Sequence, residues 1–481
     1  MKRITYLIIL SLVLFWSGCS DWLDVQPSER ISAKKLFEEG DGFRNALNGI
    51  YQEASSQTLY GRELTWGLIS IMAQDYNVNK LSYTYQYAAE YDFKSYESTK
   101  SIISNIWSKS YNLIANCNLL LNRIEKADTN IFEFKKMEKD LIKGETMAVR
   151  ALIHFDLLRL FGPSPEDKAR IAIPYVNEYP NYYTPPKTGT EVLNYIIDDL
   201  NNAANLIAYN DTIVHRSQLL TGISGRFEGS YAAKNIFFNC KGYRINYVAI
   251  HALLARIYLY AGNKAKAFEH SEYLYNKYGP HSKNRNWQFT SETNSKGHNK
   301  YIKFADDIIL AFYDPEIMTT IQDFFGSRRW TLSPDINIWF DKTKRDFRIN
   351  LINDLKESEK WIESTSTQQY RKSQNFILPV IRMSEIYYIY SECLFETGNH
   401  QSAIKVLNQI RYARGRTDAL KDLDKEAFYN ELLMEYRREF IAEGQTFFTY
   451  KRLKRDIVTS LSVFKTDNRM IPPIPENETI F

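Results

Sequence analysis

The pattern that most constrains the fold of this chain is an apolar helix, a Gly-Asn turn and a second helix, which occurs twice. The first unit runs from Tyr247 through Gly262-Asn263 to Ala267, and the second from Met383 through Gly398-Asn399 to Ala403. In both units an alanine follows the Asn by four residues, and so small a side chain lets two helices pack closely. The pattern predicts tetratricopeptide-like helical hairpins.

Further amphipathic helices are predicted at 104–124, 141–161 and 192–207, where apolar residues recur at one-face spacing. Between the helices lie four long irregular stretches at 61–100, 163–187, 211–244 and 277–339. Loops of this length commonly carry function or small elements of their own. We therefore expect an all-α fold with a loop-rich irregular half and a few short strands, and a single domain over 31–481 because no Gly/Ser-rich or Pro-rich linker divides the chain.

The first residues resemble a lipoprotein leader. Lys2 and Arg3 precede an apolar run of 12 residues from Ile4 to Phe15, which is too short to span a bilayer as a helix. Small residues then precede Cys19. We predict a signal peptide at 1–18, lipidation of Cys19 and a polar tether at 19–30, with an ordinary signal peptide followed by a chance cysteine as the alternative.

Composition narrows the function classes. The 61 Lys and Arg residues nearly balance the 57 Asp and Glu residues and form no concentrated basic stripe, so we expect no nucleic-acid partner. The three cysteines after the leader are odd in number, which excludes a disulfide framework, and Cys117 and Cys393 fall within apolar helical patterns that favour packing. The 34 tyrosines far outnumber the 7 histidines, a composition that suits binding surfaces.

No catalytic or metal-binding pattern survives inspection. The chain has no Gly-rich phosphate loop and no paired histidines with a Glu. His154 and His251 lie in apolar helices, where a core histidine bonded to a carbonyl is favoured over a ligand. Adjacent carboxylates such as Asp306-Asp307 are expected by chance in a chain with 57 Asp and Glu residues, and the pair Asp198-Asp199 is expected to face water. The acidic run 422–426 lacks the glycine of a calcium loop. We expect no enzyme, no metal and no cofactor.

Aromatic residues cluster between Tyr76 and Tyr96, where seven of 21 residues are aromatic against 14% for the chain. The alternation of Tyr83, Tyr85 and Tyr87 would place three rings on one face if the segment is extended. Such rings offer platforms for the C–H faces of sugars, and neighbouring amides can bind hydroxyls. The candidate ligand-binding residues are Tyr83, Tyr85, Tyr87, Trp66, Asn77, Trp287 and Trp330. The alternative is a Tyr-rich loop packed on its own protein.

The ordered motifs of this chain resemble the SusD/RagB family of Bacteroidetes. They are Cys19 to Pro27, Gly144 to Ala151, Phe155 to Gly162, Ile173-Pro174-Tyr175, Arg382 to Tyr387, Gly398-Asn399, Arg437 to Gly444 and Ile474 to Glu478. One departure is 445–452, where the family commonly has a basic or His residue and then Trp/Phe-x-Asp-Leu. The shared motifs are scaffold, and Arg438 and Glu439 are expected to pair or cap inside the helical core.

The resemblance implies a lipid-anchored protein of the outer-membrane surface that caps a SusC-like TonB-dependent transporter and binds glycans without catalysis. It also implies four tetratricopeptide-like hairpins. Two other functions stay open. An oligopeptide-binding RagB-like protein would favour backbone-pairing amides, and a surface glycoside hydrolase would need a convergent pair of carboxylates.

Overall fold

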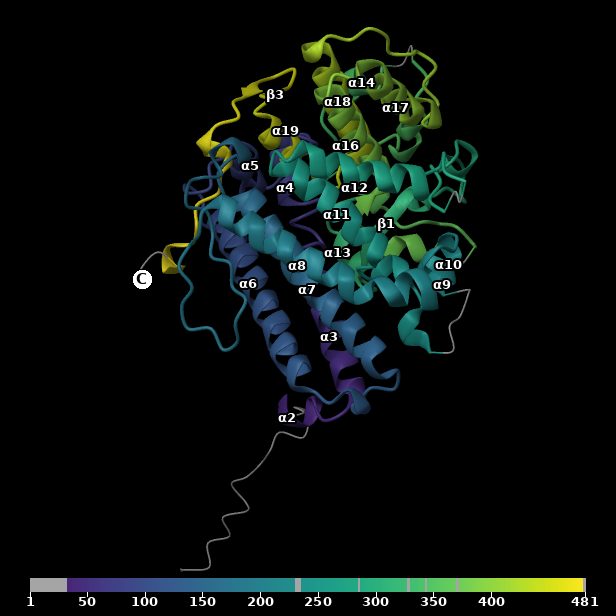
Figure 1. Cartoon of the computed structure of the whole chain (residues 1–481). Coiled ribbons are helices and arrows are strands. Elements are labelled where there is room, and N and C mark those ends of the chain that lie inside the picture. Colours follow the sequence, from purple (N-terminus) through teal and green to yellow (C-terminus); the bar gives the residue numbers. More distant parts are fainter. Residues whose placement is uncertain are drawn as a thin grey trace, which may run out of the picture.

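Helices form most of the protein in the computed structural model, which describes residues 33–229, 235–283, 286–326, 329–341, 344–368 and 372–478. The predicted signal peptide, Cys19 and the tether lie outside the described residues. The expected all-α fold is confirmed, and Figure 1 shows the long helices side by side with short helices and loops around them. No helix in the described ranges is long and apolar enough to cross a membrane.

The N-terminal half is built on four long helices, α3 (Gly40–Ala54), α6 (Glu97–Lys126), α7 (Lys135–Phe161) and α8 (Gly189–Tyr209). The last three contain the helices predicted from periodicity. Helix α7 packs between α6 and α8, so almost every side chain from Leu141 onward is buried. Helix α8 begins with a capping box, in which Thr188 and Glu191 satisfy each other's backbone N–H groups.

Both predicted hairpins are present. The first pairs α11 (Tyr247–Tyr260) with α12 (Lys264–Lys277), and the second pairs α16 (Met383–Glu396) with α17 (His400–Ala413). Gly262 and Gly398 have φ of +77° and +84° in the two turns, a left-handed conformation that favours glycine. The acidic run 422–426 is a helix start, because the Asp424 carboxylate accepts a bond of 2.8 Å from the Ala427 N–H at the beginning of α18.

Short elements make up the remainder, as expected for the loop-rich half. The strands are β1 (Ile308–Tyr313), β2 (Ile377–Arg382), β3 (Ile457–Val458) and β4 (Val463–Phe464), paired antiparallel as β1 with β2 and β3 with β4. The remaining helices are α2 (Ala33–Leu36), α4 (Leu68–Met72), α5 (Tyr83–Ala89), α9 (Arg216–Leu219), α10 (Ile223–Glu228), α13 (Ile317–Ile321), α14 (Ile336–Trp339), α18 (Lys425–Phe440) and α19 (Gln445–Leu453).

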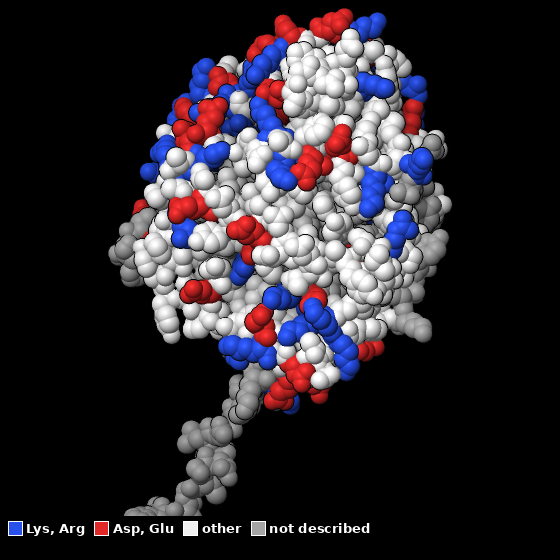
Figure 2. Space-filling view, viewed as in Figure 1, with Lys and Arg blue, Asp and Glu red and all other residues white. Residues whose placement is uncertain are grey.

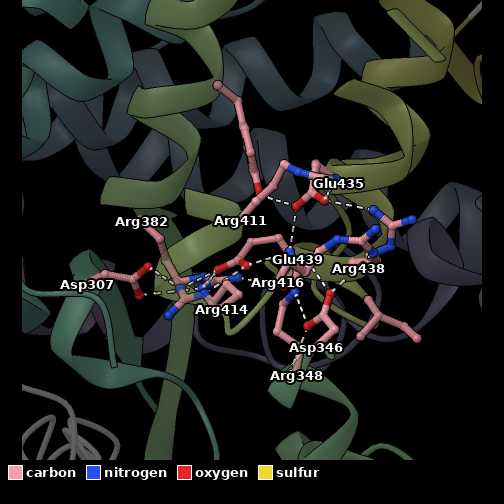
Figure 3. A network of polar contacts seen from close by, with 12 residues as sticks. Asp307, Asp346, Arg348, Arg382, Arg411, Arg414, Arg416, Glu435, Arg438 and Glu439 are labelled. Atoms are coloured by element: carbon pink, nitrogen blue, oxygen red, sulfur yellow. Dashed lines mark hydrogen bonds and ion pairs between the residues drawn. The ribbon is translucent and has the colours of Figure 1, made fainter. Parts of the chain in front are cut away.

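A buried ion network joins the C-terminal helices to the loop-rich half. Figure 3 shows arginines from β2, from the end of α17 and from the preceding loops converging on Glu435 and Glu439 of α18. The network contains the cations Arg348, Lys360, Arg382, Arg411, Arg414, Arg416 and Arg438 and the carboxylates Asp307, Asp346, Asp418, Glu431, Glu435, Glu439 and Glu443. These seven cations and seven carboxylates balance, and the exposed Lys344 adds a pair with Asp418 at the edge of the network. The expectation that Arg438 and Glu439 form pairs inside the core is confirmed: Arg438 pairs with Glu435, and Glu439 pairs with Arg382.

Candidate functional site

The Tyr-rich segment is a helix, which corrects the extended geometry considered for it. Tyr83, Tyr85 and Tyr87 lie on α5, and residues two apart on a helix point to different sides. Tyr83 is 69% exposed, whereas Tyr85 is 6% exposed and points into the core. The three rings therefore do not form one row. Residues four apart share a face, so Tyr83 and Tyr87 remain together on the outer side.

Trp66, Trp330 and Tyr85 are brought together beneath α5, in a buried cluster. The ring centroids of Trp66 and Trp330 are 5.6 Å apart, and those of Tyr85 and Trp330 are 4.9 Å apart in an edge-to-face arrangement. The Trp66 indole N–H donates to the Gly61 carbonyl at 2.8 Å, and the Tyr85 hydroxyl donates to Glu63 Oε1 at 2.8 Å. These three rings support α5 from below and present no exposed platform.

The outer side of α5 carries the exposed part of the candidate site. Tyr87 stacks on Tyr96 with ring centroids 5.2 Å apart and planes inclined by 4°, and both rings are half-buried. Asn77 lies nearby in sequence, at the start of a short turn, where its Oδ1 accepts the Asn79 N–H at 3.2 Å. We call Tyr83, Tyr87 and Tyr96 the α5 platform. Tyr96 was counted in the aromatic cluster but not among the candidates.

Trp287 lies apart from the other candidates. It is fully buried, its indole N–H donates to the Ile308 carbonyl at 2.9 Å, and its ring meets Tyr278 edge-to-face. The Arg226 guanidinium lies over its other side, 5.0 Å from the ring centre. Every part of this side chain is used in packing between the α12 end and β1.

The titratable residues considered for chemistry are used in packing. The His154 ring donates to the Arg150 carbonyl and accepts the Val176 N–H, as expected for a core histidine. His251 differs from expectation, because its Nδ1 faces His270 Nδ1 at 2.9 Å across the α11–α12 hairpin instead of a carbonyl. Burial raises the pKa of the Cys117 thiol to about 12, which suits a packing role.

The adjacent carboxylate pairs do not converge on a cleft. Asp198 is exposed, but Asp199 is buried and bonded to both Arg150 Nε and Nη2 at 2.8 Å, which corrects the expectation that both face water. Helix α7 covers the face of α8 that was predicted to be exposed to solvent. Asp307 belongs to the ion network. Within the described ranges, no group of three or more His, Cys, Asp or Glu side chains could hold a metal ion.

A second group of exposed rings was missed by sequence reasoning. Tyr179, Tyr182 and Tyr183 lie on the connection between α7 and α8 and are 41%, 95% and 61% exposed. Tyr179 lines a cavity of about 530 Å³ between this connection, α6 and α7. The signal was present in the sequence as three tyrosines, three prolines and an asparagine within 179–186. This run is shorter than the cluster at 76–96 and has three rings against seven.

The face of the molecule viewed in Figure 2 carries both signs of charge. Figure 2 shows Lys and Arg interspersed with Asp and Glu on this face, with broad uncharged areas between them. Such a surface offers no strong field of one sign, and polar uncharged or apolar contacts would decide what it binds.

Two sequence models of one protein family match this chain. The model described as the SusD family matches residues 356–470, and the model described as "Starch-binding associating with outer membrane" matches residues 21–218. Two SusD-like proteins of Formosa agariphila are each 22% identical to it, over 170 and 163 residues. Each match covers 34% of this chain, and they span only 31% and 30% of those relatives.

Solved structures resemble the whole fold. A SusD superfamily protein from Bacteroides thetaiotaomicron superposes with a TM-score of 0.70 at 22% identity, covering 92% of this chain and 97% of that one. A structure described as a putative sugar binding protein from Bacteroides vulgatus gives a TM-score of 0.69 at 20% identity, covering 92% and 96%. At these identities the likeness establishes the architecture.

Proposed function

Since this chain belongs to the SusD/RagB family, we propose that it is a non-catalytic surface lipoprotein that binds glycans and delivers them to a SusC-like TonB-dependent transporter. The matched model is described as starch-binding and associated with the outer membrane, and a similar structure is described as sugar binding. Residues 31–481 would act as one domain, which is supported by a hydrophobic core that extends from Phe43 to Met470.

The observation that carries the proposal is the α5 platform. Tyr87 and the 69% exposed Tyr83 lie on α5, whose inner face is fixed by buried tryptophans, and Tyr87 stacks on Tyr96 at the start of α6. Rigid aromatic rings bind the apolar faces of sugars without a large loss of side-chain entropy. Asn77 and Gln86 are partly exposed, and their Nδ2 and Oε1 atoms can bind sugar hydroxyls, since Gln86 Nε2 donates to the Leu81 carbonyl and Asn77 Oδ1 accepts the Asn79 N–H.

Titration calorimetry tests the proposal. The chain from Ser20 onward is titrated with soluble polysaccharides, their oligosaccharides and peptide digests. Burying one ring face removes on the order of 50 to 100 Å² of apolar surface, worth roughly 1 to 2.5 kcal/mol, so Tyr83→Ala with Tyr87→Ala should weaken glycan binding about tenfold or more. Tyr412→Ala, at a 51% exposed tyrosine on α17, is the matched control.

Three results would redirect the assignment. Binding of peptides and of no glycan would favour the oligopeptide alternative. Release of reducing sugar from a bound glycan would make the protein a hydrolase. Unchanged affinity in a folded double variant would remove the α5 platform from the site.

The membrane anchor and the transporter are tested separately. Metabolic labelling with a fatty-acid analogue should mark the wild type but not Cys19→Ala, and equal labelling of both would exclude lipidation. Gentle detergent extraction of native membranes should recover a large TonB-dependent barrel with the protein. Recovery of the protein without a barrel would count against the delivery step.

A further inference from the structure

We propose that the cavity between α6, α7 and the segment 176–187 is a second glycan-binding site, which we call the arm site. The segment lies beside α6 on the left of Figure 1, as the loop between α7 and α8. The inference rests on the proposed function, because its ligand is another part of the same glycan. The arm site is a second binding location, separate from the α5 platform.

The segment 176–187 is held in place through its backbone carbonyls. Asn118 Nδ2 donates to the carbonyls of Val176 and Glu178 at 3.0 and 3.3 Å. Arg150 Nη1 donates to the Asn177 carbonyl at 3.4 Å, and Asn122 Nδ2 lies 3.5 Å from the Tyr179 carbonyl. Four successive carbonyls are thus engaged by two helices. Such fixation preorganises the segment, which lowers the entropy cost of binding a ligand there.

The tyrosine side chains at and beyond the end of these fixed carbonyls face water. Tyr182 is 95% exposed and Tyr183 61% exposed, and Tyr179 stands at the edge of the cavity. Prolines at 180, 185 and 186 restrict the backbone between and beside them. Exposed rings on a stiffened backbone lose little conformational entropy when a ligand covers them, so they are suited to stack against sugar rings.

Three of the charged groups that line the cavity, Lys143, Glu125 and Arg150, are in ion pairs, and the other two, Lys126 and Glu178, are opposite in sign. Lys143 pairs with Glu125, and the Arg150 Nη2 is 2.8 Å from Asp199 Oδ1. Lys126 Nζ donates to Asn122 Oδ1 at 3.1 Å. The lining therefore offers no strong demand for a charged ligand. The exposed amide of Asn177 and carboxylate of Glu178 at the rim can bind the hydroxyls of a neutral glycan.

Helix α6 connects the two candidate sites. Tyr96 of the α5 platform is the N-cap of α6, and Asn122 of the arm site follows 26 residues later. At 1.5 Å per residue the two positions are about 40 Å apart. A polysaccharide can reach both sites and gain avidity from the second contact, whereas a short oligosaccharide occupies one at a time.

Affinity gel electrophoresis in amylopectin, xyloglucan and galactomannan tests the arm site. The arm variant carries Tyr179→Ala, Tyr182→Ala and Tyr183→Ala, the platform variant carries Tyr83→Ala and Tyr87→Ala, and Tyr412→Ala is the control. With the polysaccharide that retards the wild type, each multiple variant should lose about tenfold or more in affinity while its melting temperature is unchanged. The control should migrate as the wild type.

The possible results separate the two proposals. If the platform variant loses retardation and the arm variant does not, the arm site is wrong and the proposed function stands. If none of these polysaccharides retards the wild type, the glycan function fails and the arm site fails with it. Calorimetry with short oligosaccharides of the retarding polymer completes the test, because they should show two sites in the wild type and one in either variant. One site in the wild type would overturn the inference.

Discussion

The ion network and the α5 platform are two clusters of opposite design. The network holds Arg382, Arg414 and Glu439 at 0 to 1% exposure, whereas Tyr83 on the platform is 69% exposed. Every charged group of the network touches a partner of the opposite sign, but the platform rings are exposed or half-buried. The residues that identify the family thus build the scaffold. The residues that suit a ligand are those that packing leaves uncovered.

The largest expected effect comes from removing Glu439. Its Oε1 accepts bonds from Arg382 and Arg414 at 2.7 and 2.6 Å, and its Oε2 accepts from Arg348 at 3.2 Å. Burial would raise the pKa of this carboxyl, but the three guanidinium groups outweigh burial and hold the pKa well below its usual range. Glu439→Ala should cost about 3 to 5 kcal/mol or more of unfolding free energy, measured by chemical denaturation.

Glu97→Ala is the control for this loss, because Glu97 pairs with Lys100 at the surface and is 83% exposed. Its effect should stay within about 0.5 kcal/mol. Equal, small losses in both variants would show that the network contributes little and would remove the contrast.

The next effect is expected at Trp330, the ring that supports the platform from inside. Trp330 contacts Trp66, Tyr76 and Tyr85 and is 4% exposed. Trp330→Ala should cost about 3 to 5 kcal/mol through the cavity it leaves. It should also weaken glycan binding, since α5 loses its support. A variant of near wild-type stability would mean that α5 is held by other contacts.

A smaller and pH-dependent effect is expected at His154, which is buried without a carboxylate partner. Burial lowers the pKa of this imidazole to about 3. Because the folded-state pKa lies below the ordinary value of about 6.5, the neutral ring stabilises the fold above that pH, and stability falls as pH drops toward the folded pKa. The loss approaches about 1.4 kcal/mol per pH unit. His154→Gln should be less stable at neutral pH but show a shallower acid slope.

Denaturation curves of both proteins between about pH 7.5 and 4.5 measure the difference, in which the titration of shared carboxylates cancels. Parallel slopes would show that the interior accepts a charge at this position without a partner.

The smallest effect on stability is expected for Tyr83→Ala. The exposed ring contributes little to folding, so the free energy of unfolding should change by no more than about 0.5 kcal/mol. Glycan affinity should nevertheless fall about tenfold. A Tyr83→Ala variant that loses stability and keeps its glycan affinity would show that this ring serves the fold, as the ion network does, and not the ligand.

The helical framework followed from the sequence because periodicity and turn chemistry agree locally. Gly262 and Gly398 end their helices where expected, and Asp424 begins one. The features that the sequence alone did not predict depend on tertiary contacts. Tyrosines at every second position fit one face of a strand, and tyrosines four residues apart fit one face of a helix. The packing of Tyr85 against Trp330 selects the helix. Likewise Asp199 looks solvent-facing until Arg150 of α7 is placed beside it.

The length of α6 sets how far the α5 platform moves when the protein rotates. This helix has 30 residues and is about 45 Å long. Tyr96 marks one end, and the other leads into 129–132, whose backbone lies against Gly40 at the start of α3. Helix α6 packs against α3 and α7, so its two ends move together with the body of the protein. A rotation of about 20° about the end near Gly40 would displace the aromatic rings by about 15 Å, since the helix transmits rotation along its full length.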